Sequence, residues 1–187
     1  ASQPGAGDST PVQAGSGGSG IVVVRSPSNG GIFFTTCSAC APVSSLDGIN
    51  QIAEVKTSTN LNIIDTGGAT ALDYLVVGGG GAGQGDEGGA GGAGGFRSSF
   101  PGGTKLFLQP GPHAVTIGAG GSGPPASATP SCANGSSSSI SYITSAGGGG
   151  GSQSGASGGG GRFTVSGGSG CTVFSSPILS GRQGNDG

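Results

Sequence analysis

Charge is scarce in this sequence, and methionine and tryptophan are absent. Only 7% of the 187 residues are charged, against roughly 25% in ordinary soluble domains, and the net charge is −2. The six basic residues stand singly along the chain, so nucleic acid and anionic membranes are poor partners. No apolar run approaches the roughly 18 residues of a membrane span. A chain with so little self-repulsion is expected to pack, to polymerise or to be displayed on something soluble.

Catalytic groups are few as well. The single histidine, His113, lies in an alternating, strand-like run, where a half-exposed structural histidine is expected. The sequence offers no choice of histidine for a Ser/His/Asp set, no carboxylate pair in a strand context and no second Cys-x-x-Cys for a metal. We therefore predict that the protein is not an enzyme and carries neither a metal nor a cofactor.

One stretch, "LDYLVVGGGGAGQG" at residues 72–85, begins as many dinucleotide-binding units do, with an apolar strand that feeds into glycines. In such units a helix must come next, and its N-terminus binds the phosphates. The residues after Gly85 are instead "DEGGAGGAGGFRSSFPGG", whose glycines oppose a helix. No acidic residue stands about 20 positions on, where a ribose would be bound. The run is therefore interpreted as a strand that enters structural glycine.

The sequence has four cysteines: Cys37, Cys40, Cys132 and Cys171. An even count in a glycine-rich, charge-poor chain favours disulfides in an oxidising compartment. The pairs Cys37–Cys40 and Cys132–Cys171 are preferred, although four cysteines allow three connectivities. "NGS" at Asn134 is a candidate N-glycosylation site in what reads as a turn-rich loop.

Short strand-like segments succeed one another at regular spacing, and no helical periodicity competes with them. The expected strands are residues 20–26, 32–36, 51–57, 61–65, 72–77, 105–109, 113–118, 139–144, 162–166 and 171–175. Such a series predicts an all-β fold with essentially no α-helix.

Glycine-rich runs connect these strands, and glycine accounts for 47 of the 187 residues. Flexible linkers are the usual interpretation of such runs. Here, however, strands bound the runs on both sides, and "GGAGGAGG" has a three-residue period. That period matches a left-handed, polyproline II-like helix. We therefore expect packed polyglycine II segments anchored by the strands, with glycine as core material.

The order of the motifs resembles the glycine-rich domain found in phage tail-fibre and related surface proteins. The matching motifs are "DYLVVGGGGAG", "GGAGGFRSS", "HAVTIGAGGSG", "ISYITSAGGGGG" and "GGSGIVVVR". In that family the last of these is the closing strand, whereas here it stands near the N-terminus. The resemblance divides the chain into a closing-strand segment (1–27), a β segment or connector with the Cys-x-x-Cys (28–71) and a glycine-rich β module (72–187).

The displaced closing strand suggests assembly. Ile21, Val22, Val23, Val24 and Arg25 are expected to complete the sheet of a neighbouring copy, so that copies join head to tail. The alternative is that this strand folds back into its own sheet.

These patterns favour a structural role. The first hypothesis is a subunit or repeat of an extracellular fibre, secreted or on a virion appendage, whose partner is another copy of itself. The alternative is a receptor-binding adhesin of the tail-fibre type, with a glycan or cell-surface receptor as partner. Phe96, Phe100 and Tyr142 could serve it, although buried anchors at the ends of glycine runs are the preferred interpretation of these aromatics. An ice-binding role is a distant third.

Overall fold

The computed structural model describes residues 14–27, 32–33, 43–47, 50–64, 69–85, 88–124, 132–161, 165–170 and 184–187. Across these residues the fold is all-β, as the sequence predicts: the strands form two antiparallel sheets, and no helix occurs. No helix able to cross a membrane is therefore found in this part of the chain.

The larger sheet has the strand order β3-β4-β1-β6-β7, and β8 pairs with β6 beside this path. Its strands are β1 (Ile21–Pro27), β3 (Val43–Asp47), β4 (Asn50–Val55), β6 (Thr70–Val77), β7 (Phe96–Ser98) and β8 (Leu106–Leu108). Strand β1 alternates buried residues such as Val22 and Val24 with half-buried Val23 and Arg25. This period of two gives the sheet one face toward the core and one outer face.

The smaller sheet has the order β11-β10-β9-β5-β2. Its strands are β2 (Ile32–Phe33), β5 (Thr59–Ile63), β9 (Gly111–Thr116), β10 (Ser138–Ile140) and β11 (Ile143–Ser145). Strands β10 and β11 lie against β1, β6 and β7 of the larger sheet. The buried core includes Val22, Leu61, Leu72, Leu106 and Ile140, each fully buried. Burial of these side chains is the main source of stability in the strand region.

Strand β1 pairs on both sides with strands of its own chain. Val24 lies opposite Ala53 of β4 on one side and Tyr74 of β6 on the other, in both cases antiparallel. The expectation that Ile21–Arg25 completes a neighbouring copy is therefore wrong for this structure, and the alternative, that the strand folds into its own sheet, is what is found. The physical reason is the alternation of β1, which fills a core position with every second residue.

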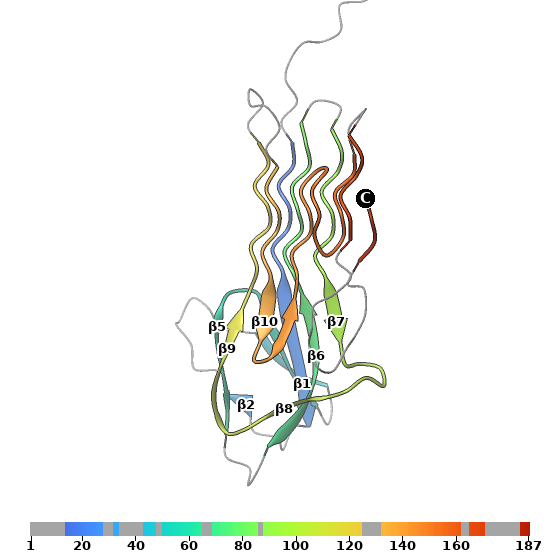
Figure 1. Cartoon of the computed structure of the whole chain (residues 1–187). Helices are drawn as coiled ribbons and strands as arrows, with labels where there is room; N and C mark the ends of the chain where they lie inside the picture. Colours follow the sequence, from blue (N-terminus) through green and yellow to red (C-terminus); the bar gives the residue numbers. More distant parts are fainter. Residues whose placement is uncertain are drawn as a thin grey trace, which may run out of the picture.

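Beyond the strands, glycine-rich segments extend side by side from the same end of both sheets (Figure 1). We call them the glycine layer; the segments are 14–20, 78–85, 88–95, 117–124, 132–137, 146–151, 155–161, 165–170 and 184–187. Their backbones lie very close together. A Cβ added to Gly81 would overlap the carbonyl of Gly149, and one added to Gly147 would overlap the carbonyl of Gly135. Glycine is therefore required at these positions by close backbone approach.

Hydrogen bonds in the glycine layer repeat every third residue. The N–H groups of residues 78, 81 and 84 donate to segment 88–95, those of 79 and 82 to segment 132–137, and those of 80 and 83 to segment 14–20. Their N···O distances lie between 2.9 and 3.1 Å, as for Gly81 to Gly92 (2.9 Å) and Gly83 to Gly15 (3.1 Å). The segment that resembles a nucleotide-binding loop thus lies inside this layer, with its backbone groups bonded to three neighbours.

The structure corrects three details of the strand prediction. Residues 139–144 form two strands, β10 and β11, joined by a turn at Ser141, whose φ is 51°. The turn lets both Ile140 and Ile143 reach the core, which residues three apart in one strand could not do. Strands β3 and β7 were not expected. The expected strand at 171–175 lies outside the described residues, as does most of the one at 162–166.

Candidate functional site

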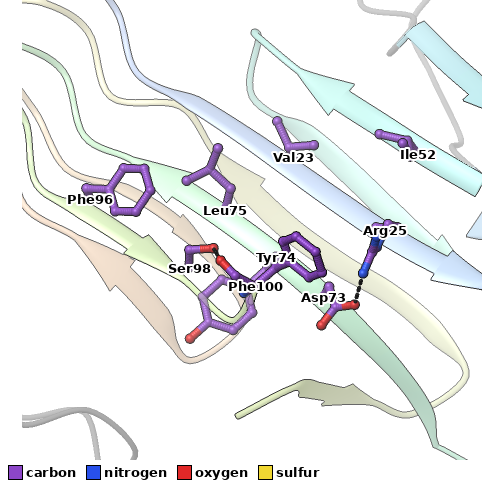
Figure 2. Close-up of a pocket in the computed structure, with 9 residues that line it drawn as sticks. All are labelled: Val23, Arg25, Ile52, Asp73, Tyr74, Leu75, Phe96, Ser98 and Phe100. Atoms are coloured by element: carbon purple, nitrogen blue, oxygen red, sulfur yellow. Dashed lines mark hydrogen bonds and ion pairs between the residues drawn. The ribbon is translucent and has the colours of Figure 1, made fainter. Parts of the chain in front are cut away.

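The outer face of the larger sheet carries a groove of about 320 Å³, near the lower end of the range of small-molecule sites, about 300–1,000 Å³. We call it the outer groove (Figure 2). Its lining residues are Val23, Arg25, Ile52, Asp73, Tyr74, Leu75, Phe96, Ser98 and Phe100. Most of this lining is apolar, and its polar groups gather around Asp73.

Strand register brings the groove residues together from four parts of the chain. Val23 of β1 lies opposite Leu75 of β6, and Leu75 lies opposite Ser98 of β7. On the other side of β1, Arg25 lies opposite Ile52 of β4. Strands β4, β1 and β6 each have a paired strand on both sides. The floor of the groove therefore presents side chains, because the backbone groups of these strands are used within the sheet.

Two phenylalanines stand at the groove with most of their surface in solvent. Phe96 is 62% exposed and Phe100 is 58% exposed, so the interpretation of these aromatics as buried anchors of the glycine runs is wrong. Tyr142, 43% exposed, lies away from the groove, where its hydroxyl accepts a hydrogen bond from the N–H of Phe107. Exposed aromatic side chains that line a cavity are a common feature of binding sites.

Phe100 is held in place by its neighbour Ser98. The Ser98 hydroxyl donates to the carbonyl of Phe100 at 2.9 Å and lies 3.1 Å from the N–H of the same residue. The guanidinium of Arg25 lies over the Phe100 ring, 4.3 Å from its centroid. Such a cation–π contact favours a fixed ring orientation, so this side of the groove is preorganised.

A cluster of charges lies beside the rings. The Asp73 Oδ2 accepts from Arg25 Nη2 at 2.9 Å and from Lys105 Nζ at 2.8 Å, and its Oδ1 accepts from the Ser99 hydroxyl at 3.2 Å. The Ser99 oxygen also accepts from the N–H of Tyr74 at 2.9 Å. Two cations thus share one carboxylate, and the cluster carries a net positive charge.

The same contacts set the ionisation of Asp73. Burial raises the pKa of this carboxyl, but hydrogen bonds from Lys105 and Arg25 outweigh burial and hold the pKa below its ordinary value of 3.8. Asp73 is therefore ionised at neutral pH. Its negative charge cancels only one of the two positive charges beside it.

The inner side of the same strands is closed. Arg97 of β7 lies opposite Val76 and is only 4% exposed. Burial raises the pKa of the Tyr74 hydroxyl, and the positive charge of Arg97 acts in the opposite direction. Neither group reaches the solvent side as Arg25 does, so the chemistry available to a ligand is that of the outer groove.

The cysteine prediction needs correction at Cys132. Cys132 is a buried free thiol whose Sγ donates to the carbonyl of Gly151 at 3.1 Å. The expected Cys132–Cys171 disulfide is therefore absent from this structure, because the thiol points into the glycine layer and bonds to its backbone. Cys37, Cys40 and Cys171 lie outside the described residues.

The other predicted site residues lie away from the outer groove. Asn134 is exposed, but it belongs to an extended segment of the glycine layer and not to a turn. Its Nδ2 donates to the carbonyl of Ser154 at 3.3 Å, and its Oδ1 accepts from the N–H of Gly150 at 2.8 Å. His113 is half-exposed, as expected, with Nε2 2.8 Å from the carbonyl of Gln109. Within the described residues no three His, Cys, Asp or Glu side chains form a metal-binding group.

Sequence reasoning missed Asp73 and Lys105, and it assigned Arg25 to assembly. The signal was available in part. In a chain with 7% charged residues, Arg25 and Asp73 each interrupt an apolar strand. What could not be read was the register that places them opposite each other.

A comparison with known families decides the affiliation of the chain. The family described as "Glycine-rich domain" matches residues 56–187. This chain belongs to that glycine-rich domain family. The match begins at residue 56, earlier than the expected start at residue 72, and it includes β5 to β11. No curated protein and no solved structure matches the chain.

Strand β1 lies outside the residues matched to the glycine-rich domain, although it is the middle strand of the larger sheet. Together with β4 it contributes Val23, Arg25 and Ile52 to the outer groove. The groove therefore combines elements of the matched glycine-rich domain with strands that precede it.

Proposed function

We propose that this protein is a surface-displayed binding module of the adhesin kind, in which the glycine layer is a rigid scaffold and the outer groove contacts the target. The observation that carries the proposal is the pair of exposed rings, Phe96 and Phe100, beside the charge cluster of Arg25 and Asp73. Aromatic residues and arginine are enriched where proteins bind partners. Such a role implies an extracellular location, for example on a virion appendage of the tail-fibre type.

The scaffold part of the proposal is that the segments of the glycine layer are polyglycine II helices. Two observations support this. The hydrogen bonds of residues 78–84 return to the same neighbour every third residue, which is the period of a polyproline II-like helix. A Cβ at Gly81 or Gly147 would overlap a neighbouring backbone, as close packing of such helices requires. A bundle bonded in several directions would resist bending and hold the groove at a fixed place.

A filament built by head-to-tail strand exchange is less well supported. For that assembly, β1 would have to leave both β4 and β6 and expose Val22 and Val24, which are buried. Strand addition uses an open edge, and β1 is a central strand. The adhesive role needs no such rearrangement.

The adhesive role can be tested by surface binding. The purified chain, carrying a fluorescent label, is applied to bacterial cells, cultured animal cells and arrayed polysaccharides. We expect retention on at least one of these surfaces and loss of it in the double variant Phe96→Ala/Phe100→Ala. The matched control is Phe107→Ala, since Phe107 is 56% exposed but does not line the groove. Absence of retention on every surface, or equal retention of the double variant, would overturn the proposal.

A further inference from the structure

We infer that the outer groove binds an acidic saccharide: a sugar chain with a carboxylate that is recognised by Arg25 while a ring face lies against Phe96 or Phe100. The inference rests on the proposed binding role of the groove and specifies its ligand. Three features carry it: the charge of the cluster, the aromatic surface and the closed backbone of the floor.

The charge cluster favours an anionic group. Arg25 and Lys105 share the single carboxylate of Asp73, and their side chains are 30% and 47% exposed. Arg25 donates to Asp73 through Nη2, one of several donor nitrogens of a planar fork that matches a carboxylate. The other charges on this face balance each other, because Glu54, opposite Val23, is 2.9 Å from Lys56. The uncompensated charge therefore lies at the end of the groove that Arg25 lines.

The aromatic surface favours a ring with a C–H face. Phe96 and Phe100 present π faces, which carry partial negative charge and attract weakly positive hydrogens. One face of a sugar ring presents several C–H groups, while its hydroxyls point outward to water. A sugar can therefore cover a phenylalanine without leaving its own polar groups buried. A purely aliphatic ligand would also cover the rings, but it would offer nothing to Arg25.

The closed floor disfavours a peptide. Peptides commonly bind to sheets by adding a strand to an open edge, and β4, β1 and β6 are paired on both sides. A ligand in the groove must be recognised by side chains alone. The cavity of about 320 Å³ also restricts the contact to a short part of a chain. A sugar acid at one position of a longer polysaccharide meets both conditions.

Calorimetric titration of the whole chain tests this inference. The probes are trigalacturonic acid and sialyllactose, with neutral partners of similar size: the methyl ester of trigalacturonic acid, and lactose. We expect at least one acidic sugar to bind and its neutral partner to bind about tenfold more weakly or less, since a charge-assisted hydrogen bond is lost. Added salt should weaken the acidic sugar more than the neutral one.

Variants locate the site. Arg25→Gln should weaken the acidic sugar about tenfold, and Arg25→Lys, which keeps the charge but not the fork, should fall between it and the wild type. Lys56→Gln is the control, because it removes a positive charge outside the cluster, and it should bind like the wild type. Circular dichroism spectra of all variants establish that they are folded. Unchanged binding in a folded Arg25→Gln variant would overturn the assignment of Arg25.

The outcomes separate this inference from the proposed function. If no acidic saccharide binds, or if the neutral sugars or a triglutamate peptide bind as tightly, the saccharide inference is wrong. The proposed function would survive that result if Phe96→Ala/Phe100→Ala still abolished retention on cells. If retention on cells does not depend on these rings, the proposed function itself fails, whatever the sugars do.

Discussion

Arg25 of β1 and Asp73 of β6 lie opposite each other in an antiparallel pair, and their side chains form an ion pair of 2.9 Å on the outer face of the larger sheet. The pair joins a strand near the N-terminus to the strand that leads into the glycine layer. It also places the guanidinium over Phe100. Stability and binding are therefore coupled at this one position.

We predict that this coupling makes stability depend on pH in the acidic range. The pKa of Asp73 is lowered in the folded protein, because hydrogen bonds from Lys105 and Arg25 outweigh the effect of burial. The stabilisation is fully present above the unfolded pKa of about 3.9 and is lost as pH falls through the lower, folded value. Thermal unfolding between about pH 6 and pH 2 should show this loss. A loss of the same size in Asp73→Asn would contradict it.

At neutral pH, Asp73→Asn should itself be destabilising. The substitution leaves Arg25 and Lys105 side by side without their shared carboxylate. We expect a decrease of about 1–3 kcal/mol in the free energy of unfolding, measured by urea denaturation. Glu54→Gln is the control: it removes a carboxylate from an exposed pair with Lys56 and should cost less than about 1 kcal/mol.

The glycine layer predicts opposite effects of alanine at two glycines. An alanine at Gly81 would place its Cβ on the carbonyl of Gly149, whereas a Cβ at Gly18 meets nothing within 4 Å. Gly81→Ala should lower the free energy of unfolding by about 1–3 kcal/mol or more. Gly18→Ala should be neutral or slightly stabilising, because alanine restricts the unfolded chain. Equal effects in urea unfolding would mean that the segments do not pack as described.

Strand β1 predicts a difference between neighbouring residues. Val24 is 1% exposed in the core, whereas Val23 lies on the outer face. Val24→Asp should unfold the chain, since it buries a carboxylate without a partner, while Val23→Asp should stay folded. Circular dichroism and gel filtration report both. A folded Val24→Asp protein that differs from the wild type only in self-association would instead favour strand exchange between copies.

Cys132 should behave as a protected thiol. Its side chain is buried and bonded to Gly151, so an alkylating reagent should label it slowly in the folded protein and rapidly in denaturant without reductant. Mass spectrometry of the Cys132 peptide gives the result. If this peptide is labelled only after reduction, Cys132 is in a disulfide, contrary to the structure.

Local patterns predicted much of the fold, because alternation and β-branched residues describe a strand wherever its partners lie. This explains why β1, β4, β5, β6, β8 and β9 were expected near their observed positions. Strand β7, with only three residues after a glycine run, has no pattern of its own and exists because β6 pairs with it. The hairpin of β10 and β11 depends on the left-handed Ser141, a conformation that serine rarely announces.

The outer groove was beyond local patterns for a related reason. Its residues come from β1, β4, β6 and β7, and only the register of these strands brings Arg25, Asp73 and Phe100 together. The three-residue period of the glycine runs, by contrast, is a local property. It was visible in "GGAGGAGG", and the hydrogen bonds of residues 78–84 repeat with that period.

The most direct test of the binding role is to map the contact on the folded protein. Amide resonances are recorded by nuclear magnetic resonance while the polysaccharide selected by the surface-binding experiment is added. The account predicts shifts at Val23, Leu75 and Phe96 in the outer groove, and none at Gly83 and Gly123 in the glycine layer. Shifts confined to the glycine layer, with the groove resonances unchanged, would contradict it.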